Sequence, residues 1–168
     1  MTIESKPSDD LFWDERLTSL YRIWCEKKGN RPAPTRADFD PTEIFALMPI
    51  LHLIDVIKEP LGFRHRLVGT ELVERMGRDV TVRWVDADTY GEAAAEIFTG
   101  LKSVATEIRP YRRRARLDWY TQHHLTTEAV EMPLIGPDGT VHMILRGAIF
   151  IVLPERLPER LEYLPLAA

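Results

Sequence analysis

The spacing of apolar residues changes several times along the chain, and each spacing predicts a different element. Residues 8–30 carry apolar side chains three and four positions apart, which predicts one amphipathic helix with a broad apolar stripe. Ser8 or Asp9 is placed to cap the start of this helix, and Gly29 to end it. The stripe consists of Trp13, Leu17, Leu20, Tyr21 and Trp24.

Proline-rich sequence separates this helix from the first predicted strand. Pro41 is suited to the first position of a short helix over residues 41–49, with Asp40 as its cap. The β-branched, apolar run at residues 50–57 predicts a strand. Residues 63–69 predict a second strand, which pairs with the first as an antiparallel hairpin.

Helical spacing returns after Gly69. The pattern predicts a short helix over residues 70–77, a loop or single turn over 84–91, and a long helix over 92–108. Thr70 is placed to cap the short helix. The long helix has one apolar face, formed by Ala94, Ile97, Phe98, Leu101, Val104 and Ile108.

Three more strands complete the pattern, at residues 111–120, 126–135 and 141–153. Pro137–Gly139 predicts a tight turn between the last two. We therefore predict the α+β class, with a five-stranded antiparallel sheet in the order two strands, helices, three strands, and an N-terminal helix. Helices on one face of such a sheet leave room for a cavity that holds a small molecule.

Composition narrows the setting of the protein. The chain has 168 residues, of which 45% are hydrophobic and 29% charged, as in an ordinary globular domain. A net charge of −4 argues against sequence-independent binding to nucleic acid as the main role. Cys25 is the only cysteine, and we see no secretory signal or membrane-spanning segment, so we expect a cytoplasmic protein.

Three runs of residues, at 31–57, 63–81 and 132–150, carry a family resemblance. The chain resembles PAS domains over roughly residues 12–153, and most closely a bacterial PAS-like subgroup with an N-terminal helix. The most specific motifs are Asp40–Pro41, Arg66–Thr70 and Gly77–Asp79. The sequence departs from the pattern at Val82, where a small residue such as glycine is expected.

The resemblance implies a sensing or scaffolding module that often pairs with itself through the helix outside its core. It implies no particular ligand, since PAS domains bind haem, flavin, small acids or nothing evident, and the cofactor stays unknown. Cys25 precedes the first strand, so flavin photosensor chemistry is not supported. The implied divisions are a disordered N-terminus at 1–8, a helical cap and linker at 9–48, a PAS-like domain at 49–155 and a C-terminal tail at 156–168.

We therefore expect a non-catalytic sensory or regulatory module that acts through a separate signalling protein. The candidate pocket residues are Leu72, Met76, Trp84, Phe98, Leu101 and Met143. The PAS-like core looks complete without the N-terminal helix, so part of the helical stripe needs other cover, which favours a homodimer. The candidate dimer contacts are Trp13, Leu17, Leu20 and Trp24.

Two alternatives remain open. One is a small isomerase or hydratase with Asp55 or a histidine as general base, although we prefer an ion pair of Asp55 with Arg64 or Arg66. The other is an interaction domain without a ligand. An enzyme predicts a polar cavity around a carboxylate or imidazole with a displaced pKa, whereas a sensor predicts an apolar or sealed cavity.

Clustered arginines and histidines are the remaining candidates for chemistry. Arg112, Arg114 and Arg116 share one face of a predicted strand, which is either a solvated surface or a site for an anion or acidic partner. The five histidines lack the spacing typical of a metal site, and we expect no metal. His123 and His124 would point to opposite faces if both are extended.

Overall fold

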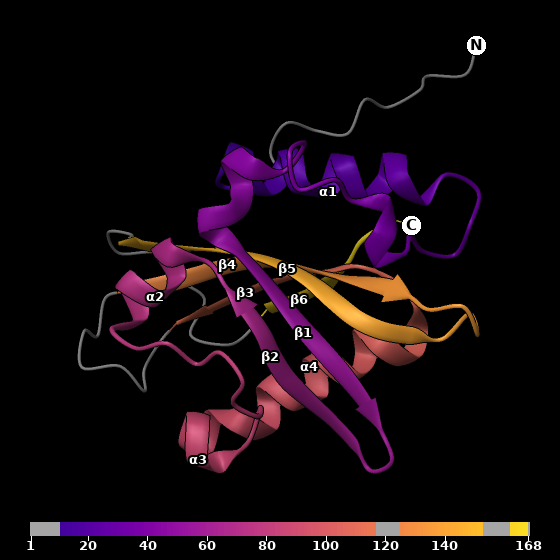
Figure 1. The fold of residues 1–168 in the computed structure, drawn as a ribbon. Coiled ribbons are helices and arrows are strands. Elements are labelled where there is room, and N and C mark those ends of the chain that lie inside the picture. The colour runs from indigo at the N-terminus through magenta and orange to yellow at the C-terminus, as the bar shows by residue number, and fades with distance from the viewer. Residues whose placement is uncertain (1–10, 117–124, 153–161, 168) are drawn as a thin grey trace.

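The structure is a computed structural model, which describes residues 11–116, 125–152 and 162–167. A single antiparallel sheet has helix α1 on one face and helices α3 and α4 on the other (Figure 1). The helices are α1 (Glu15–Lys28), α2 (Thr70–Met76), α3 (Ala87–Tyr90) and α4 (Ala94–Glu107). The strands are β1 (Leu51–Lys58), β2 (Leu61–Val68), β3 (Tyr111–Arg116), β4 (Leu125–Ile135), β5 (Val141–Val152) and β6 (Glu162–Pro165).

The strands lie in the order β2-β1-β5-β4-β3-β6, and every neighbouring pair is antiparallel. The predicted class and the two-plus-three order of the first five strands are confirmed. The sixth strand was not predicted: β6 lies in the segment expected to be a tail and pairs with the outer edge of β3. It has four residues and ends at a proline, so its sequence gives a weak strand signal.

Helix α1 packs on the sheet through Leu17, Leu20 and Trp24, which are fully buried. The Trp24 indole Nε1 donates a hydrogen bond of 2.9 Å to the carbonyl of Pro133 in β4. The helix begins later than predicted, because Asp14 caps it by accepting a bond from the Arg16 amide. The predicted caps Ser8 and Asp9 lie outside the described residues.

The segment before β1 differs from the predicted short helix. Asp40 accepts hydrogen bonds from the amide and hydroxyl of Thr42 and so forms a turn, and a 3₁₀ helix follows at Phe45–Ile50. Gly69, and not Thr70, is the N-cap of α2. Any side chain at Gly69 would place its Cβ 2.3 Å from the carbonyl oxygen of Pro49. The close approach of these two backbone segments therefore requires glycine at position 69.

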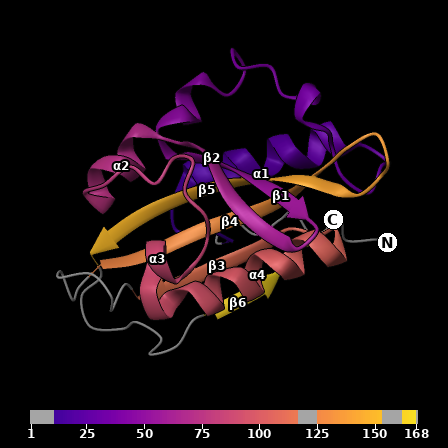
Figure 2. The same ribbon diagram turned by 60° about the horizontal axis from the view of Figure 1, so that its bottom comes forward.

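Helix α4 covers the opposite face of the sheet, as predicted (Figure 2). Its residues Ile97, Leu101 and Val104 are buried. Gly100 lets this helix approach Tyr163 of β6 closely, since a Cβ there would overlap the tyrosine ring. The sheet is therefore a single layer between two apolar clusters, one under α1 and the other under α4.

Candidate functional site

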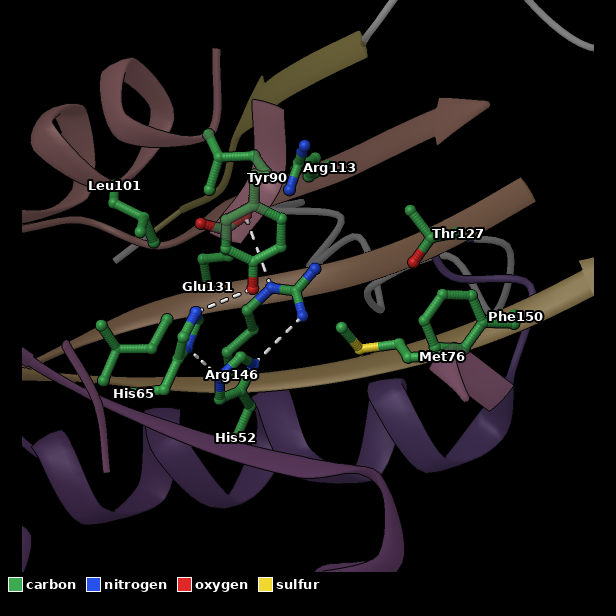
Figure 3. A pocket seen from close by; sticks show the side chains of 12 residues that line it. His52, His65, Met76, Tyr90, Leu101, Arg113, Thr127, Glu131, Arg146 and Phe150 are labelled. Atoms are coloured by element: carbon green, nitrogen blue, oxygen red, sulfur yellow. Dashed lines mark hydrogen bonds and ion pairs between the residues drawn. The ribbon is translucent and has the colours of Figure 1, made fainter. Parts of the chain in front are cut away.

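A cavity of about 50 Å³ lies between α4 and the sheet (Figure 3). Its polar lining includes His52, His65, Tyr90, Arg113, Glu131 and Arg146. Its apolar lining includes Ile54, Met76, Ile97, Leu101 and Phe150. Thr127 also lines the cavity, and its hydroxyl donates to the carbonyl of Ile149.

Strand alternation explains why these side chains meet. Successive residues of a strand point to opposite faces, and directly paired residues on neighbouring strands share a face. Arg146 of β5 pairs with His52 of β1 on one side and with Glu131 of β4 on the other. With His65 from β2 and Arg113 from β3 they form a polar row across five strands, and we use this name for the five residues below.

The two histidines form a hydrogen-bonded chain with Arg146 and Tyr90. Arginine only donates, so its guanidinium donates to His52 Nδ1, at 3.4 Å. His52 therefore carries its proton on Nε2 and donates to His65 Nδ1, at 2.5 Å. His65 in turn donates from Nε2 to the Tyr90 hydroxyl, at 2.7 Å. Figure 3 shows these hydrogen bonds linking Arg146, His52, His65 and Tyr90.

Burial keeps both imidazoles neutral. The pKa of His52 lies well below its ordinary value, because the ring is buried and because His65 and Arg146 are close. Burial, with the charges of Arg146 and Arg78, lowers the pKa of His65 to about 4. Burial also raises the pKa of Tyr90. His52, His65 and Tyr90 are thus all uncharged at neutral pH.

The other end of the polar row holds charges with unused hydrogen-bonding capacity. Glu131 is 1% exposed, and its carboxylate lies 3.8 Å from Nε of Arg146. Neither Glu131 oxygen accepts a hydrogen bond from a described residue, and Nε of Arg113 donates to none. Burial lowers the pKa of Arg146, but a guanidinium titrates so far above neutrality that it stays charged.

The predicted pocket residues divide between the cavity and other places. Met76 and Leu101 line the cavity. Leu72 is buried against Ala129 and Ala148, and Phe98 packs edge-on against Phe63.

Trp84 and Met143 do not line the cavity. Trp84 is 43% exposed and lies beside Arg64 at the outer edge of β2. Met143 points to the α1 face, because it is one residue out of phase with Ile144 and Arg146. β5 has apolar residues on both faces of the sheet, so its sequence did not indicate which residues face the cavity and which face α1.

The structure corrects the candidate dimer contacts. Leu17, Leu20 and Trp24 are buried against the sheet of their own chain and are not accessible to a second copy. The argument that the fold is complete without α1 was wrong, because β4 and β5 present an apolar face that α1 covers together with the segment before β1. Trp13 remains 41% exposed, with the Arg114 guanidinium 3.8 Å from its ring centroid.

The candidate arginine surface is occupied by contacts within the chain. Arg112 donates to the Leu11 carbonyl and pairs with Glu162, and Arg114 pairs with buried Glu128 at 2.8 Å. The Arg116 side chain lies outside the described part of the structure. Arg113, which the sequence analysis did not select, is the arginine that faces the cavity.

Asp55 lies away from the cavity. It pairs with Arg64 at 3.3 Å and with Arg66 at 3.5 Å, which confirms the preferred structural role. No cluster of three or more metal-binding side chains occurs among the described residues, and His123 and His124 lie outside them. In the same described segments, no helix has the length and apolar character to cross a membrane.

Polar residues inside apolar strands were the signal that the sequence analysis passed over. His52 follows Leu51 and precedes Leu53, and Glu131 and Arg146 also interrupt apolar runs. Such residues are rarely buried without a partner, so their position alone favours a buried polar site. Which of these polar residues contact one another depends on the register of the paired strands, and the sequence analysis did not predict that register.

Comparison with known proteins agrees with this architecture. The PAS domain family profile matches residues 14–149, close to the span over which the resemblance was expected. No curated protein and no solved structure matches the chain. The family match covers most of the sequence and includes every residue that lines the cavity except Phe150. The chain belongs to the PAS domain family.

Proposed function

We propose that the protein is a non-catalytic sensory module that binds a small molecule in the cavity beneath α4. The observation that carries the proposal is the charged interior, where Glu131 and Arg113 have hydrogen-bonding capacity that no described residue uses. Buried charge without full hydrogen bonding costs free energy, and a bound molecule that supplies the bonds offsets that cost. PAS domains are typically sensory or regulatory and usually non-catalytic, which supports the same role.

The signal would be a shift in packing between two arrangements with different affinity for the ligand. β4 and β5 line the cavity on one face and support α1 on the other, so they are the natural route between the two. We propose that a separate signalling protein receives the change at the surface of the module. A second copy of the chain remains a predicted partner. Among the candidate dimer contacts, Trp13 is the one that is exposed.

Native mass spectrometry of the purified full chain, with metabolite extraction, tests the proposal. A compound that is released unchanged on denaturation supports sensing. A chain that carries no compound and takes up none from a metabolite library contradicts ligand binding and favours an interaction domain. Chemical conversion of a bound compound contradicts the non-catalytic role.

A small isomerase or hydratase is the second candidate, because the cavity is polar and its imidazoles have lowered pKa values, as we expected of an enzyme. The hydrogen bonds argue against a histidine base. Both ring nitrogens of His52 and of His65 already have partners, so neither ring has a lone pair directed at a substrate. Glu131 is then the better candidate for a base, and Glu131→Gln would abolish any turnover.

A further inference from the structure

The charges that line the cavity do not balance. Arg113 and Arg146 are cations, Glu131 is an anion, and the two histidines are held neutral by their hydrogen bonds. The lining therefore has one positive charge in excess. An uncompensated charge in a buried site is costly, so the most favourable occupant carries one negative charge.

The unused hydrogen bonds define the occupant further. The oxygens of Glu131 can only accept, so they need a donor from the occupant. Arg113 can only donate, so it needs an acceptor, and the guanidinium fork matches a carboxylate. A molecule that meets both needs has an anionic acceptor group and a neutral hydroxyl or similar donor.

Size and shape limit the hydrocarbon part. A cavity of about 50 Å³ holds on the order of four waters, or a ligand of a few more non-hydrogen atoms after small adjustments. Ile54, Ile97 and Leu101 form an apolar wall beside the polar row. This wall suits a short aliphatic chain and not a large ring system.

We propose, on the basis of the proposed function, that the ligand is a short-chain hydroxycarboxylic acid bound as its monoanion. Its carboxylate binds between Arg113 and Arg146, its hydroxyl donates to Glu131, and its carbon chain packs on the apolar wall. With this occupant the cavity is neutral. A phosphate dianion would leave it negative, and a zwitterionic amino acid would leave the positive charge uncompensated.

Isothermal titration calorimetry of the full chain with lactate, in parallel with four analogues, tests the ligand class. Propionate lacks the hydroxyl, lactamide lacks the charge, alanine carries an extra positive charge, and sulfate carries two negative charges and no hydroxyl. We expect lactate to bind about ten-fold more tightly than propionate, and by a larger margin over the other three. Equal affinity for propionate would overturn the role of Glu131, and equal affinity for lactamide would overturn the anionic class.

Substitution of the arginines locates the site. Arg113→Met should abolish lactate binding, and Arg113→Lys should weaken it because lysine lacks the fork. Arg66→Met, which removes a cation from the opposite face of the sheet, should leave the affinity unchanged. Circular dichroism shows whether each variant is folded. Unchanged affinity in folded Arg113→Met would place lactate elsewhere and overturn the proposal.

The outcomes separate this inference from the proposed function. If no small acid binds but another class of compound is retained by the purified chain, sensing stands and the ligand class is wrong. If lactate binds and is converted, the ligand class stands and the non-catalytic role is wrong. If nothing binds in either experiment, both are wrong.

Discussion

Val82 has a backbone conformation that β-branched residues rarely adopt, with φ at 65°. It is the position where the family pattern led us to expect a small residue. Its amide donates to the His65 carbonyl, and the His65 amide donates to Arg83, so this loop fixes one member of the polar row. The strain thus lies at the edge of the candidate site.

Val82→Gly should raise the free energy of unfolding by about 0.5–1 kcal/mol. Relief of left-handed strain outweighs the added entropy of the unfolded chain, and little packing is lost because Val82 is 72% exposed. Urea denaturation measures the change. Arg83→Gly is the matched control, since Arg83 is exposed in the same loop and has no positive φ, and it should lose stability. A loss in Val82→Gly as large as in the control would contradict the strain.

His65 makes stability depend on pH. Its folded pKa of about 4 lies below the ordinary value of 6.5, so between these values the unfolded chain binds a proton that the folded chain does not. Stability should therefore fall as pH falls, by about 2 kcal/mol for His65 alone between pH 7 and pH 5. Urea unfolding across this range measures the slope.

Two variants assign the pH slope. His65→Gln removes one of the two buried imidazoles and should reduce the slope, and His52, whose pKa is also lowered, accounts for the part that remains. Tyr90→Phe removes the hydrogen bond to His65 but keeps the ring, so it should lower stability at every pH and retain most of the slope. An identical slope in wild type and His65→Gln would show that another group is responsible.

At the scale of elements, the packing of α1 depends on a glycine in β5. A Cβ at Gly147 would lie 2.6 Å from Cδ2 of Leu20 and 3.1 Å from Cδ2 of Leu17. Helix α1 therefore packs directly on the backbone of the sheet at Gly147, the residue that follows Arg146 in β5. This contact explains why the apolar stripe is buried within one chain.

Gly147→Ala should cost about 1–3 kcal/mol by forcing α1 outward. Leu20→Ala should cost about 2–5 kcal/mol by leaving a void. In the double variant the new methyl group enters that void, so the combined loss should be smaller than the sum of the two. Thermal or urea unfolding of all four proteins completes the cycle. Additive losses would show that the two positions do not touch.

Elements were predicted better than the site. Apolar spacing located the two long helices and the first five strands, because each of these buries a continuous face. The spacing of residues could not show whether the odd-numbered or the even-numbered side chains of β3 face the cavity, because Arg112, Arg113 and Arg114 are chemically alike. His52 and His65 are 13 positions apart and meet only through strand pairing, with a register shift between Leu53 and Ile54. Register depends on the hydrophobic patterns of both strands and on the turn between them, and a shift of this kind within a strand pair changes it.

At the scale of the whole molecule, a single sheet separates the cavity from α1. Adjacent residues of β5, Arg146 and Gly147, contact the two sides. Occupancy of the cavity can therefore change the support of the helix without any long-range pathway.

Saturation with lactate should slow amide hydrogen exchange in α1 as well as in α4, because binding favours the better-packed arrangement. Mass spectrometry of peptides covering Glu15–Lys28 measures the effect. Arg113→Met should lose it, whereas Arg66→Met should keep it. Slower exchange confined to α4 would show that binding does not reach the helix.

β6 has a consequence for how the protein is made. Tyr163 packs over Gly100 of α4 and against the guanidinium of Arg113, which lines the cavity, so this part of the cavity wall is supported by a strand that follows β1–β5 along the chain. A nascent polypeptide cannot complete this wall until residues 162–166 have left the ribosome. The side of the site around Arg113 therefore gains its full support only after β6 has been made and has paired with β3.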